Sequence, residues 1–341
     1  MKRCIRLCAL VVLSSQLSFT QHIAKYAGEF LSLGVGGRAL ALGGSYVALA
    51  QDGFACYWNP AALARIDYPE IVLMHEERFA GLINYDFGSV SIPVGKENSI
   101  GIGVLRLGVD NIADTRLAGI DVNGNPIPPD QYENAVRLDY SKITYFTAAD
   151  WAFYFTYAQR SKENFSYGVN VKVIYHSIAS ESALGIGFDA GILYSPRERW
   201  WIGVNAQDIT TTLVAWSTGT NELISPTIKI GTAYFLDFLK GTFAPTVDCD
   251  VRFENRRTAS VASLGPISFD PHVGLEYDYK HAIAIRVGYS DVKQLTLGAG
   301  LHLRKLDIDY AFARFGEENL LGDTHRISLR LLLQEERFSR R

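Results

Sequence analysis

The chain has 341 residues, and its 33 Lys and Arg against 36 Asp and Glu give a formal net charge of −3. This balance argues against a nucleic-acid partner, because phosphate backbones are bound by basic surfaces. After the first twenty positions no run of 18 apolar residues occurs, which excludes a membrane-spanning helix there. The 30 Gly, 18 Tyr and 18 Phe favour an all-β protein, and a transmembrane β-barrel fits because its strands alternate apolar and polar residues.

The first twenty residues have the pattern of a secretory signal peptide. Lys2, Arg3 and Arg6 precede an apolar run over 7–13, and small residues follow before Gln21. We predict export and cleavage before Gln21. Removing these residues takes away three cations, so the mature chain is more acidic than the whole.

The region after this leader is dominated by small residues. Gly and Ala are frequent across 27–66, and charged residues are few. Small side chains let backbone pack closely against backbone, which favours a segment that fills a confined space. Near its end, Asn59 can cap a short helix that Pro60 opens. We predict that residues 21–68 form an N-terminal plug.

The same region carries the pattern G-x-G-x-R-A-x-x-x-G-G, then Tyr-Val-Ala-x-A-x-D, then an aromatic residue before Asn-Pro-Ala. The pattern resembles the N-terminal hatch of the PorV/PorQ family of outer-membrane proteins, which are relatives of the FadL-type channels for hydrophobic compounds. The matching positions are Gly34, Gly36, Arg38, Ala39, Gly43, Gly44, Tyr46, Val47, Ala48, Asp52, Trp58, Asn59, Pro60 and Ala61. A second, shorter match, 106–112 with Thr115, is similar to the start of a long loop in the same group.

From Ile71 onward, apolar and polar residues alternate with a period of two, as in strands that present a different environment to each face. Most such segments hold about ten residues, enough to cross a bilayer when tilted. We predict an antiparallel transmembrane β-barrel of about fourteen strands over 69–333, followed by a periplasmic C-terminal tail over 334–341. The predicted strands are 71–76, 81–93, 98–107, 150–159, 165–177, 185–195, 199–208, 227–236, 242–252, 271–279, 282–290, 294–303, 306–313 and 324–333.

The connections between these segments differ in length in a regular way. The even-numbered connections are all short, whereas every long connection, including 108–149, 209–226 and 253–270, is odd-numbered. Outer-membrane barrels have short periplasmic turns and longer extracellular loops, so this pattern favours a barrel over a soluble sandwich. An even strand number places both ends of the barrel on the periplasmic side, where we expect the plug to enter.

The polar face of the alternating segments carries charges of both signs. A closed sheet leaves no unpaired edge in hydrocarbon, so this face must line the lumen. We predict a filled lumen with paired charges rather than an open pore. The predicted lumen charges are Lys172, Asp189, Asp248, Asp250, Arg252, Glu276, Arg286, Arg304, Asp307, Asp309, Arg326 and Arg330.

Two of the four cysteines, Cys56 and Cys249, lie outside the leader. Cys56 belongs to the predicted plug, whereas Cys249 lies on the apolar face of its predicted strand. Because they occupy opposite surfaces of the barrel wall, we expect both thiols to be free.

Motifs for cofactors and catalysis are incomplete. Gly34-x-Gly36-x-x-Ala39 has the spacing of a dinucleotide fingerprint, but Gly43 and Gly44 would interrupt the helix that the fingerprint requires. No Gly-x-Ser-x-Gly elbow occurs, although a Ser/His pair formed between neighbouring strands stays open as a third possibility. We predict no cofactor and no enzymatic activity.

The segment from Asp121 to Asn125 has the alternating oxygen ligands of a calcium loop. Pro126 stands where that loop needs Gly, and Tyr132 stands where it needs Glu. A turn at Asn123–Gly124 within the long loop is the favoured interpretation, with calcium kept as a minor alternative. The sequence predicts no metal site.

The resemblance implies a protein of the bacterial outer membrane that acts in type IX secretion or in surface attachment of secreted proteins. Its expected partners are outer-membrane lipid and secreted proteins or other secretion components. The alternative is a FadL-like channel for hydrophobic small molecules, in which an apolar cavity would reach the plug.

Overall fold

The computed structural model describes residues 28–79, 81–253, 260–314, 323–335 and 339–340. The predicted signal peptide 1–20, the first plug residues 21–27, and parts of the loop 253–270 and of the tail 334–341 lie outside these residues. The short helices are η1 (Glu29–Ser32), α2 (Gly37–Ala41), α3 (Ala55–Trp58), η2 (Pro60–Arg65), η3 (Pro129–Asn134) and η4 (Tyr140–Lys142). Among the described residues, no helix is long and apolar enough to cross a membrane.

Alternation of side chains produces a continuous antiparallel sheet. Its strands are β1 (Glu70–Arg78), β2 (Ile83–Val94), β3 (Asn98–Asp114), β6 (Thr144–Lys162), β7 (Phe165–Ile178), β8 (Glu181–Arg197), β9 (Trp200–Gln207), β12 (Thr227–Tyr234), β14 (Gly241–Arg252), β16 (Ile267–Tyr279), β17 (Ile283–Tyr289), β18 (Leu295–His302), β19 (Leu306–Arg314) and β20 (Thr324–Leu332).

The sheet closes on itself because β1 pairs with both β2 and β20. In the described part of the chain, fourteen strands pair in the order of the preceding list, so the predicted barrel is confirmed. Along 165–177 of β7 the odd positions are exposed or half-exposed and the even positions are buried. A closed ring with an apolar outer face and satisfied backbone groups is the form in which strands cross a bilayer.

Shorter strands extend the hairpins or lie within the loops. They are β4 (Gly119–Ile120), β5 (Arg137–Leu138), β10 (Thr212–Trp216), β11 (Asn221–Ile224), β13 (Leu236–Phe238) and β15 (Ala262–Leu264). One end of the barrel carries the short turns, at 95–97, 163–164, 198–199, 280–282 and 303–305. The opposite end carries the long connections 115–143, 208–226 and 253–266. We refer to these as the short-turn end and the long-loop end.

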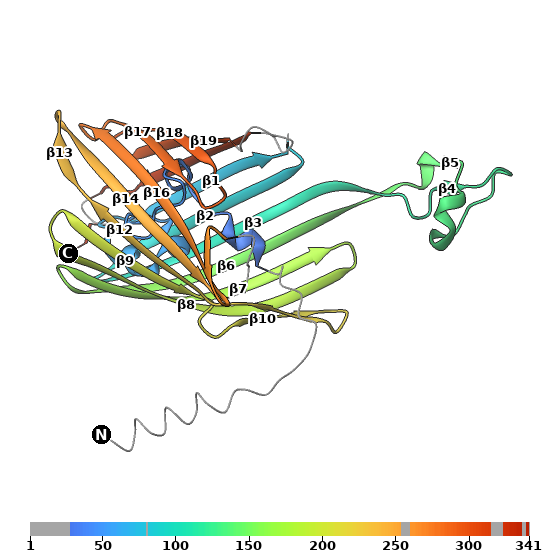
Figure 1. The fold of residues 1–341 in the computed structure, drawn as a ribbon, viewed down its shortest axis with the longest axis horizontal. Coiled ribbons are helices and arrows are strands. Elements are labelled where there is room, and N and C mark those ends of the chain that lie inside the picture. Colours follow the sequence, from blue (N-terminus) through green and yellow to red (C-terminus); the bar gives the residue numbers. More distant parts are fainter. Residues whose placement is uncertain (1–27, 80, 254–259, 315–322, 336–338, 341) are drawn as a thin grey trace, which may run out of the picture.

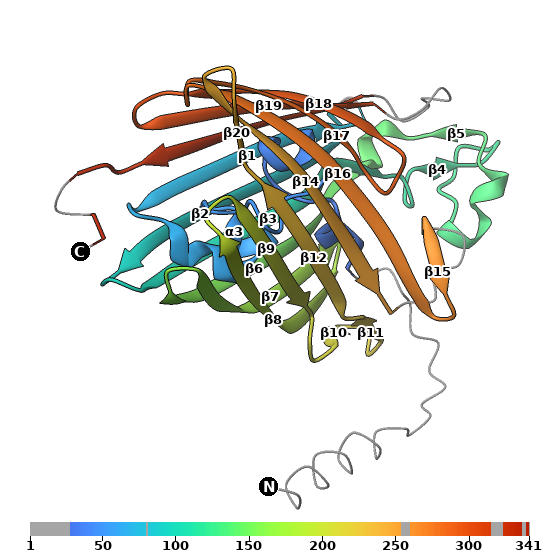
Figure 2. The ribbon, with the colours of Figure 1, turned by 60° about the vertical axis from the view of Figure 1, so that its left-hand side comes forward.

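The N-terminal segment, residues 28–66, lies inside the ring of strands (Figure 2). Its first described residue, Gly28, lies against Ile224 at the long-loop end. Its last turn lies at the short-turn end, where Arg65 donates to the Glu163 carbonyl over 2.6 Å. The described segment therefore runs the length of the lumen before β1 begins, and the point at which the chain enters the barrel lies outside the described residues.

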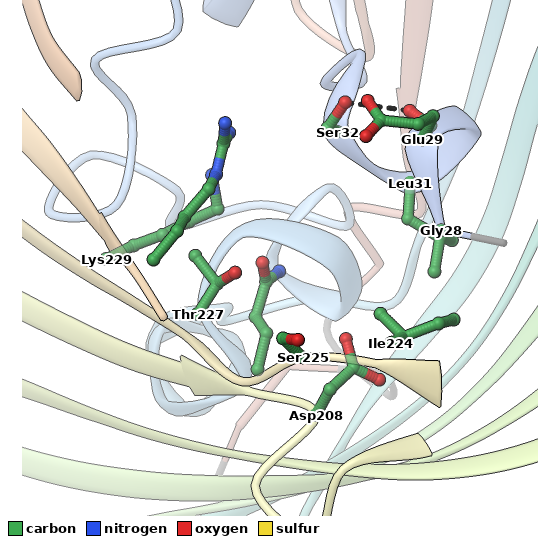
Figure 3. A pocket seen from close by; sticks show the side chains of 11 residues that line it. Gly28, Glu29, Leu31, Ser32, Asp208, Ile224, Ser225, Thr227 and Lys229 are labelled. Carbon is green, nitrogen blue, oxygen red and sulfur yellow. Dashed lines mark hydrogen bonds between the residues drawn. The ribbon is translucent and has the colours of Figure 1, made fainter. Parts of the chain in front are cut away.

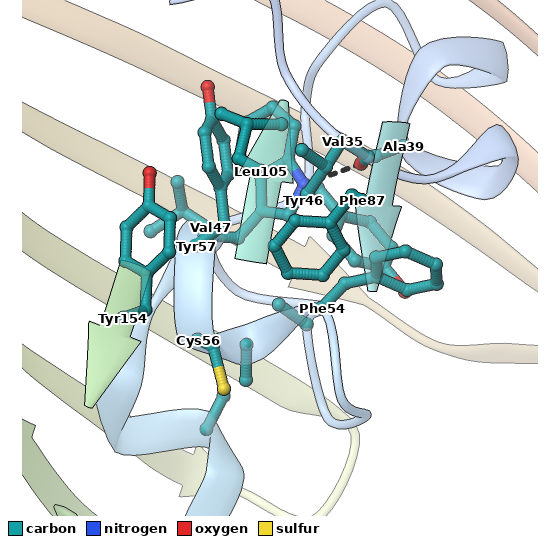
Figure 4. Close-up of a cluster of buried hydrophobic side chains, with 14 of the residues drawn as sticks. Val35, Ala39, Tyr46, Val47, Phe54, Cys56, Tyr57, Phe87, Leu105 and Tyr154 are labelled. Carbon is teal, nitrogen blue, oxygen red and sulfur yellow. Dashed lines mark hydrogen bonds between the residues drawn. The ribbon is translucent and has the colours of Figure 1, made fainter. Parts of the chain in front are cut away.

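Small residues allow this close packing, as the sequence predicted. η2 begins after Asn59, whose side chain accepts from the Ala61 amide over 3.1 Å, with Pro60 in the first position. Figure 4 shows the cluster that results, in which aromatic side chains of the segment meet side chains of β2, β3 and β6. Phe54 stacks on Phe87 with ring centroids 5.7 Å apart.

Two barrel strands continue well past the wall. β3 and β6 extend beyond the predicted ends at 107 and 150 and carry β4, β5 and η3 at their tip, clear of the barrel (Figure 1). We call residues 109–147 the arm. The sequence predicted only a loop here, because the polar residues of 108–149 mask the short apolar stretches that prolong the pairing of β3 with β6.

Candidate functional site

The barrel interior brings charged side chains of the strands together with the N-terminal segment. Most of the predicted lumen charges are less than one-tenth exposed. The exceptions are Asp307 and Arg330, which are half-buried, and Arg304, which is exposed. The half-buried pair, Asp307 and Arg330, still interacts over 3.4 Å. Arg304 is wrong as a lumen residue, because it lies exposed in the turn between β18 and β19, where the alternation has ended.

The first interior ion group is centred on Lys172 of β7, which is 2% exposed. Its ammonium lies 3.2 Å from the Asp189 carboxylate and 2.9 Å from that of Asp208. Asp208 also accepts from the Thr212 hydroxyl over 2.6 Å. One cation thus compensates two buried carboxylates.

A second group crosses from the N-terminal segment to the far wall. Arg38 donates to both oxygens of Glu276, at 2.7 and 2.6 Å, and Arg286 donates to the same carboxylate over 2.5 Å. Arg286 also reaches Asp309 over 2.6 Å. Bidentate contacts of this kind fix orientation as well as charge, so they anchor the segment to the wall.

Two further ion groups lie in the interior. Asp250 pairs with Lys229 and lies 3.2 Å from Arg252, which also reaches Asp270 over 3.3 Å. Arg326 pairs with Glu76.

The predicted plug-motif residues all belong to the segment inside the barrel. Asp52 accepts from the Tyr46 hydroxyl over 2.5 Å, and the Trp58 indole donates to the Val35 carbonyl over 2.8 Å. The Asn59 amide group donates to the Ile192 carbonyl over 3.1 Å. The remaining motif residues are buried at Gly34, Gly36, Gly43, Pro60 and Ala61 and half-buried at Arg38 and Gly44.

Gly43 has a specific steric role. Its φ of +66° is one that L side chains rarely adopt, and a Cβ there would lie 2.6 Å from the Tyr289 amide nitrogen. The His272 ring donates to the Gly43 carbonyl over 2.8 Å. Only glycine permits this approach of segment to strand.

Barrel strands around the whole ring hold the segment through polar contacts. Asp248 of β14 accepts from the amides of Tyr46 and Val47 over 2.7 and 2.8 Å. On the opposite side, Asn170 of β7 donates to the Cys56 carbonyl over 2.8 Å. Satisfying these groups matters because a buried polar group without a hydrogen-bond partner is destabilising.

Cavities remain between the segment and the wall near the long-loop end. A cavity of about 50 Å³ lies where η1 meets Asp208, Ile224 and Lys229 (Figure 3). A larger one, about 270 Å³, is lined by Glu29, His272 and members of the Asp250 ion group. Both have polar and charged linings.

The thiols and the loop turn agree with expectation where the structure tests them. Cys56 and Cys249 are both free. Asp121 accepts from the Asn123 and Asn125 amides over 2.8 Å each, closing a turn at the tip of the arm. The backbone hydrogen bond from Asn125 is the main cause that lowers the pKa of Asp121 below its ordinary value. Within the described residues, no group of three or more His, Cys, Asp or Glu side chains could hold a metal ion.

Comparison with known proteins gives the family. Residues 135–330, more than half of the chain, match the family model described as type IX secretion system membrane protein PorP/SprF. The chain belongs to the PorP/SprF family. This match confirms the association with type IX secretion proteins but not with the PorV/PorQ group, and it covers barrel residues rather than the N-terminal pattern that carried that resemblance.

Solved structures resemble the fold of this PorP/SprF-family chain at low identity. The Ralstonia pickettii toluene transporter TbuX aligns with a TM-score of 0.58 and 13% identity, over 88% of this chain and 98% of its own. The monoaromatic hydrocarbon channel CymD gives a TM-score of 0.60 and 12% identity, over 92% and 100%. A Pseudomonas aeruginosa FadL homologue gives 0.51 and 13%, over 93% and 100%. No curated protein matches the sequence.

Fold and family together assign the chain to the outer membrane as a β-barrel. Sequence reasoning found most interior charges of this PorP/SprF-family barrel but missed several partners. Glu76 and Asp208 were not predicted, although Glu76 shares the alternation parity of Val72 and Met74. Asp208 was the last residue of the predicted strand 199–208, on the parity of the outer face, but β9 ends at Gln207 and the chain turns inward there.

Proposed function

We propose that this protein serves type IX secretion by binding secreted proteins or other secretion components at its long-loop end, in a role like that of PorV/PorQ proteins. The family match carries this proposal. The interior adds support, because ion groups and the N-terminal segment occupy the space that an open pore would need. The barrel is then a docking platform in the membrane rather than the conduit itself.

The proposed role requires binding and no chemistry, so the protein is not expected to be an enzyme. Binding falls to the connections 108–149, 209–226 and 253–270. The first of these has the strongest support, because it forms the arm that projects from the wall (Figure 1). The N-terminal segment acts as the plug that keeps the barrel closed while partners dock outside.

A deletion strain tests the proposal. Without this protein, type IX cargo should fail to reach the cell surface, and the full-length gene should restore it. A variant with the arm replaced by a short turn should insert normally into the outer membrane yet restore little surface cargo. Normal surface cargo in the deletion strain would refute the secretion role.

A channel for hydrophobic small molecules is the second candidate. Its support is the likeness of the fold to the toluene transporter TbuX and to the monoaromatic hydrocarbon channel CymD. The charged linings of the interior cavities weigh against it. Uptake of labelled toluene into cells that make the protein, compared with cells that lack it, separates the two functions, since only a channel increases uptake.

A further inference from the structure

The arm exposes a strand edge that the barrel leaves unpaired. β3 pairs with β2 only as far as Gly108, and β6 pairs with β7 only from Ala148 onward. Beyond these points, within the described part of the chain, the two strands pair only with each other. Each therefore presents an outer row of backbone N–H and C=O groups, which is a template for an added strand.

The two edges differ in how well they suit a partner strand. The edge of β3 is interrupted by a register shift after Val109, and Asn111 there has a φ of +58°. Bulges and charges blunt an edge against pairing. The edge of β6, residues 144–147, reads Thr-Tyr-Phe-Thr and carries no charge, and the extra residue at the register shift belongs to β3 rather than to β6. These residue types favour extended pairing.

A groove adjoins this edge of β6. A cavity of about 390 Å³ lies between the arm and the turn after β7, with Ile112, Phe146 and Ile178 among its lining residues. Ile178 is 47% exposed, and the neighbouring Tyr145 is 67% exposed. Because side chains of a strand alternate, an added strand would place every second side chain over this apolar floor.

Charge selects the kind of partner. Residues 108–149 hold six acidic and three basic residues, a net charge of −3. Two arms of the same sequence would repel each other, which disfavours a second copy of this chain. A basic extended segment is attracted instead.

We propose that the arm binds a basic, extended segment of a partner protein as an added β-strand along residues 144–147 of β6. Alternate side chains of that segment occupy the groove at Phe146, and its cationic side chains face the acidic arm. This inference rests on the proposed function for its partner, a protein of the secretion process. It adds the binding mode and the chemistry of the bound segment.

The test uses the full-length protein in detergent and two eight-residue probe peptides, one alternating Lys with Val and one alternating Glu with Val. The Lys–Val peptide should bind about tenfold or more tightly than the Glu–Val peptide, and its binding should slow hydrogen exchange of the amides over 144–147. Unchanged exchange over 144–147 with bound peptide would overturn the inference, as would equal binding of both peptides.

Matched variants separate strand addition from general attraction. Phe146→Lys places a cation in the groove and should weaken Lys–Val binding about tenfold or more. Tyr140→Lys makes the same charge change elsewhere on the arm, at an exposed residue off this edge, and should change binding less than about twofold. Equal weakening by both would refute strand addition. Should Phe146→Lys not fold, Ile178→Lys on the facing wall of the groove replaces it.

The peptide assay and the secretion assay fail independently. If the Lys–Val peptide protects residues 144–147 but arm deletion leaves surface cargo normal, the secretion role is wrong and strand addition stands. If cargo export needs the arm but these amides gain no protection, the secretion role stands and the added-strand mode is wrong.

Discussion

Replacing Lys172 with Met should strongly destabilise the barrel. Lys172 compensates Asp189 and Asp208 at 3.2 and 2.9 Å, and it is 2% exposed. Methionine preserves most of the side-chain volume but removes the charge. Two carboxylates then remain buried next to each other without a cation.

The expected loss of stability follows from the burial of these three charged side chains. Removing one partner of a buried ion pair costs about 3–5 kcal/mol. The remaining hydrogen bonds are to neutral donors and do not replace the lost cation: Asp189 still accepts from the Asp208 amide over 2.9 Å and from the Asn170 side chain over 3.2 Å, and Asp208 still accepts from the Thr212 hydroxyl. We therefore expect the unfolding equilibrium constant to rise by roughly two to four orders of magnitude.

The assay is reversible unfolding of the protein in lipid vesicles by guanidinium, followed by tryptophan fluorescence. The control is Lys172→Met combined with Asp189→Asn and Asp208→Asn, which removes the unpaired charges and should recover most of the lost stability. A loss below about 1 kcal/mol for Lys172→Met alone, or no recovery in the triple variant, would refute the argument that these charges are buried and mutually compensated.

Three further predictions concern the segment, the thiols and the arm. Gly43→Ala should detach the N-terminal segment from the barrel wall and make it accessible to protease. Gly95→Ala, at a residue with a similar φ of +62° but open space around it, should lower the free energy of unfolding by only about 1 kcal/mol and leave the segment protected. Equal protease sensitivity of the two variants would show that backbone strain matters and the contact with the wall does not. Maleimide should modify half-buried Cys249 in the native protein and fully buried Cys56 only after denaturation, as mass spectrometry can check. Since the folded pKa of Asp121 is lowered, its turn should persist as the pH falls to the ordinary aspartate value and open only below it; an NMR titration midpoint at the ordinary value would contradict this.

The barrel itself could be predicted from the sequence, because alternation of apolar and polar residues reports directly on the two faces of each strand. The segment 165–177 shows this, with β7 at Phe165–Ile178. The asymmetry of loop lengths likewise indicated two different ends. Both signals are local and need no knowledge of which strands meet.

The rest depends on contacts between distant residues, which local patterns do not encode. The sequence predicted a plug but not its path, in which Gly28 lies at the long-loop end and Arg65 at the short-turn end. Arg304 continued the charged pattern past the end of its strand and so was misplaced. The arm was missed because a loop and a two-stranded ribbon without a core have similar compositions.

The position of the N-terminal segment has a consequence for how the protein matures. β1 and β20 form the seam that seals the ring, and the chain that leads into β1 already occupies the enclosed space. If the ring of strands closed first, the N-terminal segment would have to thread into the lumen past Arg286, Lys172 and the carboxylates that pair with them. We therefore expect assembly in the membrane to follow an order, in which the strands close around the N-terminal segment and β1 pairs with β20 last.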